Sequence, residues 1–407
     1  MRSGGERLRT WSAICVVVAA VLFTASASAL ARHRAQARHK SVNSEEGAES
    51  VSGAKLTDAY VSACVMEPGS GRVIFQKDMH KPWPPASMTK MMLILLVAEK
   101  LHDGSLKLSD QVSTSALASK MGGSQVYLKE GETFSLDDMM KAIVVHSAND
   151  ASLAMAEYVA GSGEAFVVMM NKRAQELGMK DTLYRSPHGL PPAPGQPPDI
   201  TSAYDSALLA RELIKHPDVL RWSSIDTCGF RNNTFELRNT NHLIRTYKGC
   251  DGLKTGFYYA AGFNVTATAR RQNLRLVAVV MGSPRKQQNF NSAATLLSQG
   301  FMEYYQYAVA KKGVAIAQSV PISGGAAGQI KPVWGADLNV FMKHGEEKTA
   351  FKVDYALPAS LQAPIKAGQD LGTGNVTVDG QVAGSAPLIA PEDVPRGGIL
   401  SRLIGKL

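Results

Sequence analysis

The sequence predicts an α+β domain, in which helices pack on one sheet, followed by a small all-β domain. Residues 59–79 have the pattern of a strand hairpin around a Pro-Gly-Ser-Gly turn. Residues 106–176 follow a helical pattern, and strand-like runs return in "GFNVTATARR" and "LRLVAVVMG". The first strands are therefore expected to pair with these late ones. After about Lys312 short strand-like stretches alternate with turns and no helical pattern appears, which predicts the second domain.

The N-terminus has the pattern of a secretory signal peptide. A basic stretch precedes the apolar run Trp11–Thr24, and small residues follow at 25–31, with cleavage expected after Ala29 or Ala31. The alternative is a retained membrane anchor, but the apolar run is shorter than the ~20 residues that a spanning helix needs. We therefore expect an exported protein at the periplasmic or extracytoplasmic face of the cell membrane.

The helical segments carry recognisable start signals. Ser135 precedes "LDDMMKAIVV", whose first turn is acidic, and either Thr201 or Ser202 can cap the helix that follows a Pro/Gly-rich loop. A further helix is expected over "NSAATLLSQGFMEYYQYAV", closing the first domain. The predicted organisation is a signal peptide at 1–31, a flexible linker at 32–54, the α+β domain at 55–311, the all-β domain at 312–392 and a tail at 393–407.

Composition and charge indicate which kinds of partner suit this chain. Of the 407 residues, 45% are hydrophobic and 19% charged, so the chain can bury a sizeable core. The net charge of +9 comes from scattered basic residues without aromatic interleaving, so no nucleic-acid partner is predicted. An anionic membrane or cell-wall polymer fits this charge as well.

Three cysteines remain after Cys15 leaves with the signal peptide, namely Cys64, Cys228 and Cys250. This odd, sparse count is no disulfide framework. Two states stay open, a single Cys228–Cys250 bridge or buried free thiols. No CxxC pattern or Cys/His cluster has metal-ligand spacing, so the cysteines predict no metal site. The functional hypothesis reached below implies no metal and no organic cofactor.

The C-terminal tail "RGGILSRLIGKL" is amphipathic. Its apolar residues share one helical face, and basic residues flank them. The tail is either a frayed or docked terminus or an interfacial anchor, and about five buried aliphatic side chains would give only marginal, reversible attachment. Of the two hypotheses, peripheral membrane contact through residues 396–407 is the more specific one.

The first candidate for chemistry is the pair Ser87 and Lys90 in "PPASMTKMMLILLV". Residues three apart on a helix share a face, so the two side chains can meet. Burial by the apolar residues that follow would lower the lysine pKa, and the helix N-terminus favours a developing alkoxide. A neutral amine beside a hydroxyl is a general base beside a nucleophile. On its own, however, S-x-x-K is a common pattern that also suits a cap with an exposed lysine.

Two further segments strengthen this interpretation. In "HSAND", the Asn149 amide can orient a substrate carbonyl while Ser147 relays protons. In "GLKTGF", Lys254 and Thr255 can bind a carboxylate, and Gly256 lets a substrate backbone approach an edge strand closely. Alone, the two segments equally suit a polar helix break and a turn into a strand. Together and in this order, S-x-x-K, S-x-N and K-T-G are the signature of penicillin-binding proteins and class A β-lactamases.

The chain resembles the low-molecular-weight penicillin-binding proteins, serine-type D-alanyl-D-alanine carboxypeptidases of the peptidase S11 family. The resemblance runs from about Ala59 to Pro395 and is carried by "PPASMTKMM", "HSANDAS", "SPHGL", "TSAYDSALLA", "DGLKTGFYYAAGFN" and "APLIAPEDV". It implies a penicillin-binding or β-lactamase-like transpeptidase fold, an antiparallel sheet with helices and a helical subdomain. The tail matches the membrane anchor of such enzymes.

The resemblance also implies a role for each motif residue. Ser87 would be the acylated nucleophile, Lys90 the base for acylation, and Ser147 a proton relay. Asn149 would line the site while Lys254 and Thr255 hold the terminal carboxylate of the substrate. The backbone N–H groups of Ser87 and of Phe257, which follows Gly256, would form the oxyanion hole.

Some positions depart from the family pattern or invite a plainer interpretation. Relatives often carry a polar residue, frequently His, where this chain has Phe257, and Arg285 is the nearest candidate for an arginine that helps bind the carboxylate. The loop 191–198 looks longer and richer in proline than usual. His188 and Asp205 are interpreted as structural polar residues that stabilise the loop below the site.

The function expected from this resemblance is removal of the terminal D-alanine from peptidoglycan stem pentapeptides, through an acyl-enzyme on Ser87. β-Lactams would acylate the same serine and leave slowly. The alternatives are a DD-endopeptidase that cuts cross-links and, from a different class, a catalytically inactive wall-binding scaffold. A β-lactamase is less favoured, because no E-x-x-L-N segment supplies the Glu that class A enzymes use for deacylation.

Overall fold

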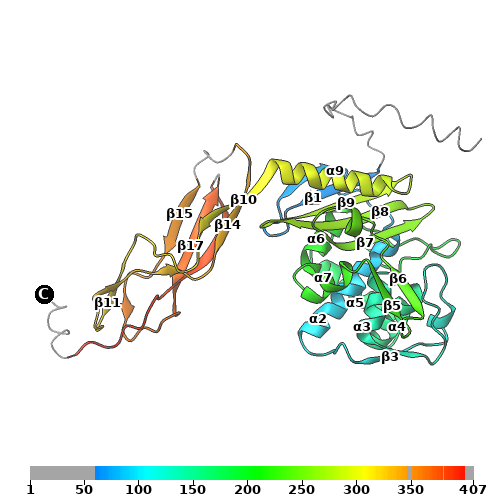
Figure 1. Ribbon diagram of the computed structural model, residues 1–407, viewed down its shortest axis with the longest axis horizontal. Coiled ribbons are helices and arrows are strands. Elements are labelled where there is room, and N and C mark those ends of the chain that lie inside the picture. Colours follow the sequence, from blue (N-terminus) through cyan, green and yellow to red (C-terminus); the bar gives the residue numbers. More distant parts are fainter. Residues whose placement is uncertain (1–59, 346–350, 379, 399–407) are drawn as a thin grey trace, which may run out of the picture. The chain divides into compact units, whose positions relative to one another are not determined.

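The computed structural model describes residues 60–345, 351–378 and 380–398, and Figure 1 shows its two folded parts. The predicted signal peptide and linker lie outside the described residues, as does the apolar face of the tail at 399–407. Each folded part has its own hydrophobic clusters. The predicted class, an α+β domain followed by an all-β domain, is confirmed.

The first part is built on a five-stranded antiparallel sheet of order β2-β1-β9-β8-β7. Its strands are β1 Ser62–Met66, β2 Val73–Lys77, β7 Cys250–Tyr258, β8 Gly262–Arg271 and β9 Leu274–Ser283. β1 pairs with β9, in a register that sets Cys64 opposite Val279. The first strands therefore do pair with the last ones, as the sequence predicted, and β7 with its K-T-G motif forms one edge.

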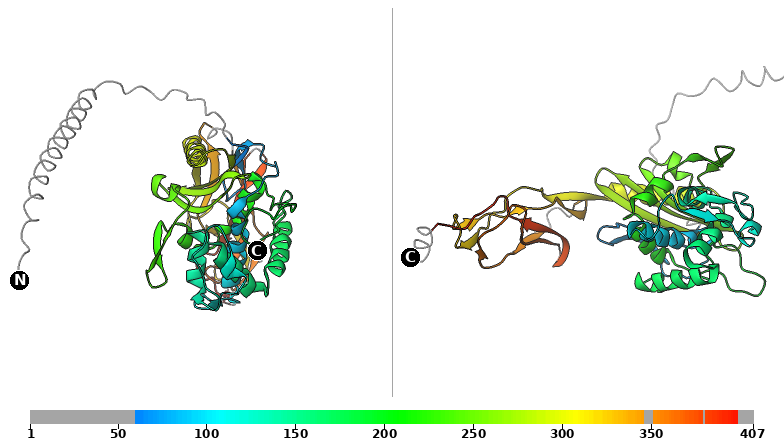
Figure 2. Two further views of the ribbon diagram at one scale, coloured as in Figure 1. Left: turned by 90° about the vertical axis from the view of Figure 1, so that its right-hand side faces the viewer. Right: turned by 90° about the horizontal axis from the view of Figure 1, so that it is seen from below.

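Side chains alternate between the two faces of this sheet because successive residues of a strand point in opposite directions. Cys64 and Met66 of β1 belong to the core that the sheet shares with the helices α2 to α7, which lie between Lys90 and Ser223 in the chain. Ala63 and Val65 belong to the core under α9, Gln288–Glu303. Figures 1 and 2 show α9 on one face of the sheet and the helices α2 to α7 gathered on the opposite face. The apolar runs of β8 and β9 follow from burial on both faces.

The remaining elements of this part are mostly helices. Ser135 and Ser202 cap α3 and α6, and their hydroxyls accept from Asp138 N and Asp205 N. The elements are η1 Ala86–Thr89, α2 Lys90–His102, β3 Gln111–Ser113, η2 Ala118–Lys120, β4 Thr133–Ser135, α3 Leu136–Val144, α4 Asn149–Ala160, α5 Gly163–Glu176, α6 Ala203–Leu213, α7 Pro217–Ser223, β5 Thr227–Phe230, β6 Phe235–Arg238, α8 Leu243–Thr246 and α9 Gln288–Glu303.

The last helix ends earlier than its sequence predicted. α9 ends at Glu303, and the following "YYQYAVA" forms β10, which pairs with β14 of the all-β part. Tyrosine and valine favour extended backbone, so this aromatic run leaves the helix where the amphipathic pattern weakens. The strands of the second part are β10 Tyr304–Ala310, β11 Val320–Ser323, β12 Gln329–Ile330, β13 Val333–Trp334, β14 Leu338–Lys343, β15 Lys352–Ala356, β16 Leu361–Gln362, β17 Asp370–Val378 and β18 Gln381–Ile389.

The three described cysteines are free thiols. Of the two states left open by the sequence, the Cys228–Cys250 bridge is therefore wrong. Cys64 is fully buried in β1, and burial raises its thiol pKa to about 12, which keeps it protonated and unreactive.

Within the described part of the chain, no single helix is long and apolar enough to cross a membrane. α4 and α5 pass the same length and composition test only as a pair, which is bent by 81°.

Candidate active site

Ser87 lies in the tight turn η1, immediately before the buried helix α2. Its neighbour Ala86 has a φ of 50°, in the left-handed region that non-glycine residues rarely adopt. Strand β7 presses against this turn, because a Cβ on Gly256 would collide with the Pro85 carbonyl oxygen and lie 3.1 Å from Ser87 N. A glycine at 256 thus allows the end of β7 and the serine backbone to approach each other.

Lys90 is fully buried, and its amino group makes three contacts. Nζ donates to Ser87 Oγ over 3.0 Å, to Asn149 Oδ1 over 2.7 Å and to the His188 carbonyl oxygen over 2.6 Å. Burial and the nearby charge of Lys254 hold the Lys90 pKa well below its usual range. A lysine in this state can accept the proton of a serine hydroxyl.

Ser147 and Asn149 come from the turn into α4. Ser147 has a φ of 65°, a strained conformation that points its hydroxyl toward Lys254, whose Nζ donates to Ser147 Oγ over 2.8 Å. The Asn149 amide is fixed from both ends, since its Nδ2 donates to the Gly122 carbonyl over 2.7 Å while its Oδ1 accepts from Lys90. Asp150 secures the facing loop by accepting from the N–H groups of Val126 and Leu128.

Lys254 lies on β7 with its side chain almost wholly buried, and burial lowers its pKa to about 7. Its amino group is occupied by Ser147 and by the Thr255 carbonyl oxygen. Thr255, by contrast, lines the open pocket and donates to Thr240 Oγ1 over 2.7 Å. The two residues expected to bind a carboxylate thus face different surroundings.

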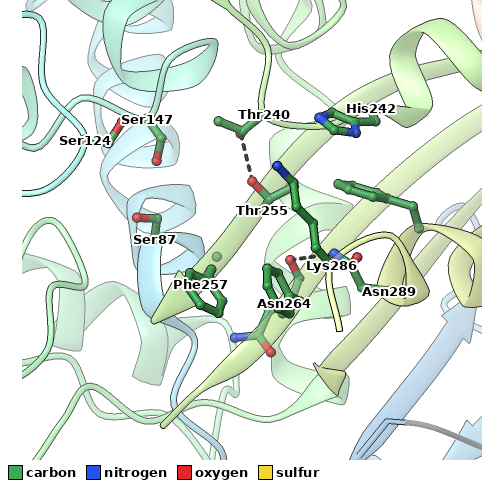
Figure 3. A pocket seen from close by; sticks show the side chains of 13 residues that line it. Ser87, Ser124, Ser147, Thr240, His242, Thr255, Phe257, Asn264, Lys286 and Asn289 are labelled. Carbon is green, nitrogen blue, oxygen red and sulfur yellow. Dashed lines mark hydrogen bonds between the residues drawn. The ribbon is translucent and has the colours of Figure 1, made fainter. Parts of the chain in front are cut away.

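A pocket of about 470 Å³ opens in front of Ser87. Figure 3 shows Ser87 and Ser147 across this pocket from Thr255 and Lys286. Phe257 is about half exposed and stacks on Phe263, with ring centroids 4.1 Å apart. The pocket is lined by Ser87, Ser124, Ser147, Thr240, His242, Thr255, Gly256, Phe257, Phe263, Asn264, Lys286, Asn289 and Phe290.

Comparison with known proteins decides the family. A family model described as D-alanyl-D-alanine carboxypeptidase matches residues 50–285, and one described as the penicillin-binding protein 5 C-terminal domain matches 304–396. The D-alanyl-D-alanine carboxypeptidase DacF of Bacillus subtilis is 37% identical over 86% of this chain and 89% of its own length. The chain belongs to the D-alanyl-D-alanine carboxypeptidase family, peptidase S11.

Solved structures agree with this membership. Penicillin binding protein 5 of Haemophilus influenzae is 29% identical, with a TM-score of 0.65 over 83% of this chain and 98% of that one. Penicillin-binding protein D2 of Listeria monocytogenes, solved in an ampicillin-bound form, is 28% identical, with a TM-score of 0.55 over 60% of this chain and 99% of that one. The S11 enzyme described here is accordingly a serine-type D-alanyl-D-alanine carboxypeptidase and a penicillin-binding protein.

The fold of this carboxypeptidase gathers the residues that the sequence singled out. Ser87, Lys90 and Asn149 form one connected group, and Lys254 with Ser147 forms a second. Their roles in the reaction stay predictions. Phe257 lies at the pocket as expected, whereas the pocket-lining cation is Lys286 and not its neighbour Arg285.

The two residues interpreted as structural do support loops. Asp205 accepts from Asp181 N and from the Thr182 hydroxyl, which ties α6 to the turn before it. His188 touches Lys90 through its carbonyl oxygen, and its ring accepts from Leu190 N. Burial and the Lys90 charge lower the His188 pKa to about 3, so the ring is neutral at physiological pH.

Sequence reasoning missed several lining residues of the S11 pocket. Thr240 and His242 come from the loop before α8, and Asn289 and Phe290 from the start of α9. His242 stacks on Phe290, with ring centroids 5.0 Å apart. No short spacing pattern connects these residues, because only the sheet brings them together. The basic pair Arg285-Lys286 after β9 was the one available signal.

Proposed function

We propose that this carboxypeptidase releases the terminal D-alanine of peptidoglycan stem pentapeptides through an ester formed on Ser87. The observation that carries the assignment is the contact between the Ser87 hydroxyl and the buried Lys90 amine. Lys90 accepts the hydroxyl proton while Ser87 Oγ attacks the carbonyl carbon of the D-Ala-D-Ala bond. The N–H groups of Ser87 and Phe257 stabilise the oxyanion.

Collapse of the tetrahedral intermediate breaks the C–N bond, and the leaving amine needs a proton. Ser147 is placed to deliver it, because its hydroxyl accepts a hydrogen bond from Lys254 and can pass a proton on. Free D-alanine then departs. Before the second step, Lys90 loses the Ser87 proton to solvent and Lys254 regains one from it. Water then attacks the Ser87 ester and gives a proton to the neutral Lys90. Lys90 returns this proton to Ser87 Oγ as the ester C–O bond breaks, which restores the hydroxyl and releases the shortened peptide. A β-lactam would form the same ester but retain its opened ring, which slows the water step.

The substrate carboxylate is expected at the side of the pocket formed by Thr240, Thr255 and Lys286. Both hydroxyls and the ammonium group are hydrogen-bond donors, and Figure 3 shows the Lys286 side chain reaching toward the two threonines. Lys254 supports this site from behind through its contact with the Thr255 carbonyl oxygen. The terminal D-alanine of a pentapeptide carries a free carboxylate next to the scissile bond, which is the group that this side of the pocket would bind.

One experiment tests the nucleophile directly. After incubation with penicillin, the intact mass should rise by one penicillin, and peptide sequencing should place the adduct on Ser87. The Ser87→Ala variant should show neither the adduct nor D-alanine release from a pentapeptide. An adduct on another residue, or D-alanine release by the variant, would overturn the assignment.

We also propose export and peripheral membrane contact. The basic, apolar and small-residue pattern of residues 1–31 and the amphipathic sequence of 396–407 support both. N-terminal sequencing of the mature protein should begin after Ala29 or Ala31. Deletion of residues 396–407 should reduce binding to anionic vesicles without loss of activity, and unchanged binding would contradict the anchor.

A further inference from the structure

Asp199 is a buried carboxylate in the loop that leads to α6, and none of the three motifs includes it. Two backbone bridges fix its position, because Ile200 pairs with Leu183 and Thr201 pairs with Trp83. Only 5% of its surface is exposed. An ionised group at such a place is expensive unless it is hydrogen-bonded, so its partners indicate its purpose.

Four donors converge on this carboxylate. Oδ1 accepts from Arg185 N over 2.5 Å and from Ser186 N over 3.0 Å. Oδ2 accepts from the Ser186 hydroxyl over 2.7 Å and from the Thr89 hydroxyl over 3.3 Å. Burial raises the Asp199 pKa, and the four donors oppose this rise because they stabilise the ionised carboxylate.

These contacts lead directly to the proposed base. Thr89 is the residue before Lys90, in the turn that carries Ser87. On the other side, Ser186 Oγ accepts from Gly189 N over 2.8 Å, and the carbonyl of the intervening His188 accepts from Lys90 Nζ. Gly189 packs so closely that a Cβ there would collide with the Ala86 carbonyl oxygen. The loop 185–189 therefore encloses the base, and Asp199 holds its start.

We propose that Asp199 is a positioning residue for acylation, which aims the Lys90 amine at Ser87 by fixing the loop 185–189 and Thr89 around it. The inference rests on the proposed role of Lys90 as the base. Geometry carries it, since one carboxylate bonds to elements on both sides of the Lys90 side chain. Loss of the Asp199 hydrogen bonds would let the His188 carbonyl and the turn that carries Ser87 move apart.

Asp199 also contributes charge. The groups that act on Lys90 are Lys254, whose charge lowers its pKa, and Asp199 and Asp150, whose charges raise it against the effect of burial. The His188 ring nearby is neutral. Removal of the Asp199 charge should therefore lower the Lys90 pKa further. Lys90 would then stay neutral down to a lower pH. The acid limb of the pH–rate profile, in which protonation of Lys90 stops acylation, should therefore move to lower pH.

The test measures the acylation rate of Ser87 by a fluorescent penicillin across pH, in the full chain, together with the melting temperature. Asp199→Asn should acylate about tenfold more slowly or worse, because small misplacements of reacting groups are costly. Its acid limb should move to lower pH. Ser186→Ala keeps the charge but cuts the link to Gly189, so it should slow acylation with the acid limb unchanged.

Asp205→Asn is the matched control. Asp205 is also a buried aspartate that ties backbone to a helix, but its partners Asp181 and Thr182 do not contact Lys90. This variant should melt earlier, with the rate and the acid limb of the parent. A merely structural role for Asp199 predicts the same result for both aspartates.

Three results would overturn the inference. The first is a folded Asp199→Asn variant that keeps the acylation rate and the acid limb of the parent. The second is an Asp205→Asn variant whose acylation rate and acid limb change as much as those of Asp199→Asn. The third applies if Asp199→Asn does not fold, and is a Ser186→Ala variant that acylates at the rate of the parent. Failure of the proposed function is recognised separately, because the parent protein itself would then carry no adduct on Ser87, and the inference would fall with it.

Discussion

The amino group of Lys254 donates to the Ser147 hydroxyl over 2.8 Å, although 107 residues separate the two in sequence. Each of the two residues is in a state that costs free energy. Ser147 holds a left-handed backbone conformation, and Lys254 is a buried lysine whose pKa falls to about 7. Such strain and desolvation persist where the surrounding fold over-determines them, and they cluster at reactive sites. The contact joins the helical subdomain to the edge strand of the sheet.

The Lys254→Met variant should be less active and more stable than the wild type. In the unfolded chain a lysine keeps its proton up to about pH 10.4, whereas folded Lys254 loses it above about pH 7. Between these values the unfolded state binds more protons, so wild-type stability rises with pH. Below about pH 7 both states are protonated, and the full cost of burying the charge is felt. Methionine has no such cost and fills similar space.

Melting temperatures of both proteins from pH 6 to 10 check this expectation. The advantage of Lys254→Met over wild type should be largest at pH 6 and should shrink as the pH rises through about 7 toward 10. D-alanine release should fall by about a hundredfold or more, since a proton relay contributes that much. A difference in melting temperature that does not change with pH would contradict the assigned pKa.

Gly256→Ala adds a single methyl group to the K-T-G motif, and we expect it to abolish the active-site geometry. The new Cβ would collide with the Pro85 carbonyl oxygen and crowd Ser87 N, so strand β7 and the nucleophile turn must separate. We expect loss of penicillin labelling and a free energy of unfolding reduced by about 1–3 kcal/mol, as for overpacked positions. Gly122→Ala is the control, because a Cβ there meets nothing within 4 Å. Equal labelling of both variants would contradict the close approach.

The sequence was sufficient for the parts of the site that short spacing encodes. Ser87 and Lys90 lie on one turn, and their contact follows from helix geometry. The hairpin at residues 59–79 and the late strands followed from periodicity, and their pairing from the order of elements. Asp199 and the pocket residues Thr240 and Lys286 could not be found in this way. Their partners are distant in sequence, so only tertiary contacts distinguish them from ordinary loop residues.

Phe257→His should change substrate fit and leave the chemistry intact. The part of Phe257 that we assign to the oxyanion is its backbone N–H, which any residue but proline retains. Its ring stacks on Phe263, an interaction worth about 0.5–1.5 kcal/mol beyond area burial. We expect Ser87 labelling to continue and KM for a pentapeptide to change by less than about tenfold. A loss of labelling would show that the ring itself supports the nucleophile.

Lys286→Ala should weaken binding of the substrate carboxylate without slowing the acyl transfer step. Lys286 lines the pocket and, among the residues that the structure describes, makes no ion pair, so its charge is available to a ligand. An exposed ion pair contributes about 0.2–1 kcal/mol, which corresponds to a rise in KM of a few-fold with kcat retained. Steady-state D-alanine release from a pentapeptide measures both constants.

Arg285→Ala supplies the matched control for this prediction, since Arg285 neighbours Lys286 but does not line the pocket. Its KM should equal that of the parent. A cross-linked muropeptide whose acceptor is a lysine side chain carries no carboxylate next to the scissile nitrogen, so the parent should cut it slowly and Lys286→Ala should not change that rate. Rapid cleavage of the cross-link would instead favour an endopeptidase, and equal KM changes in the two variants would remove Lys286 from the carboxylate site.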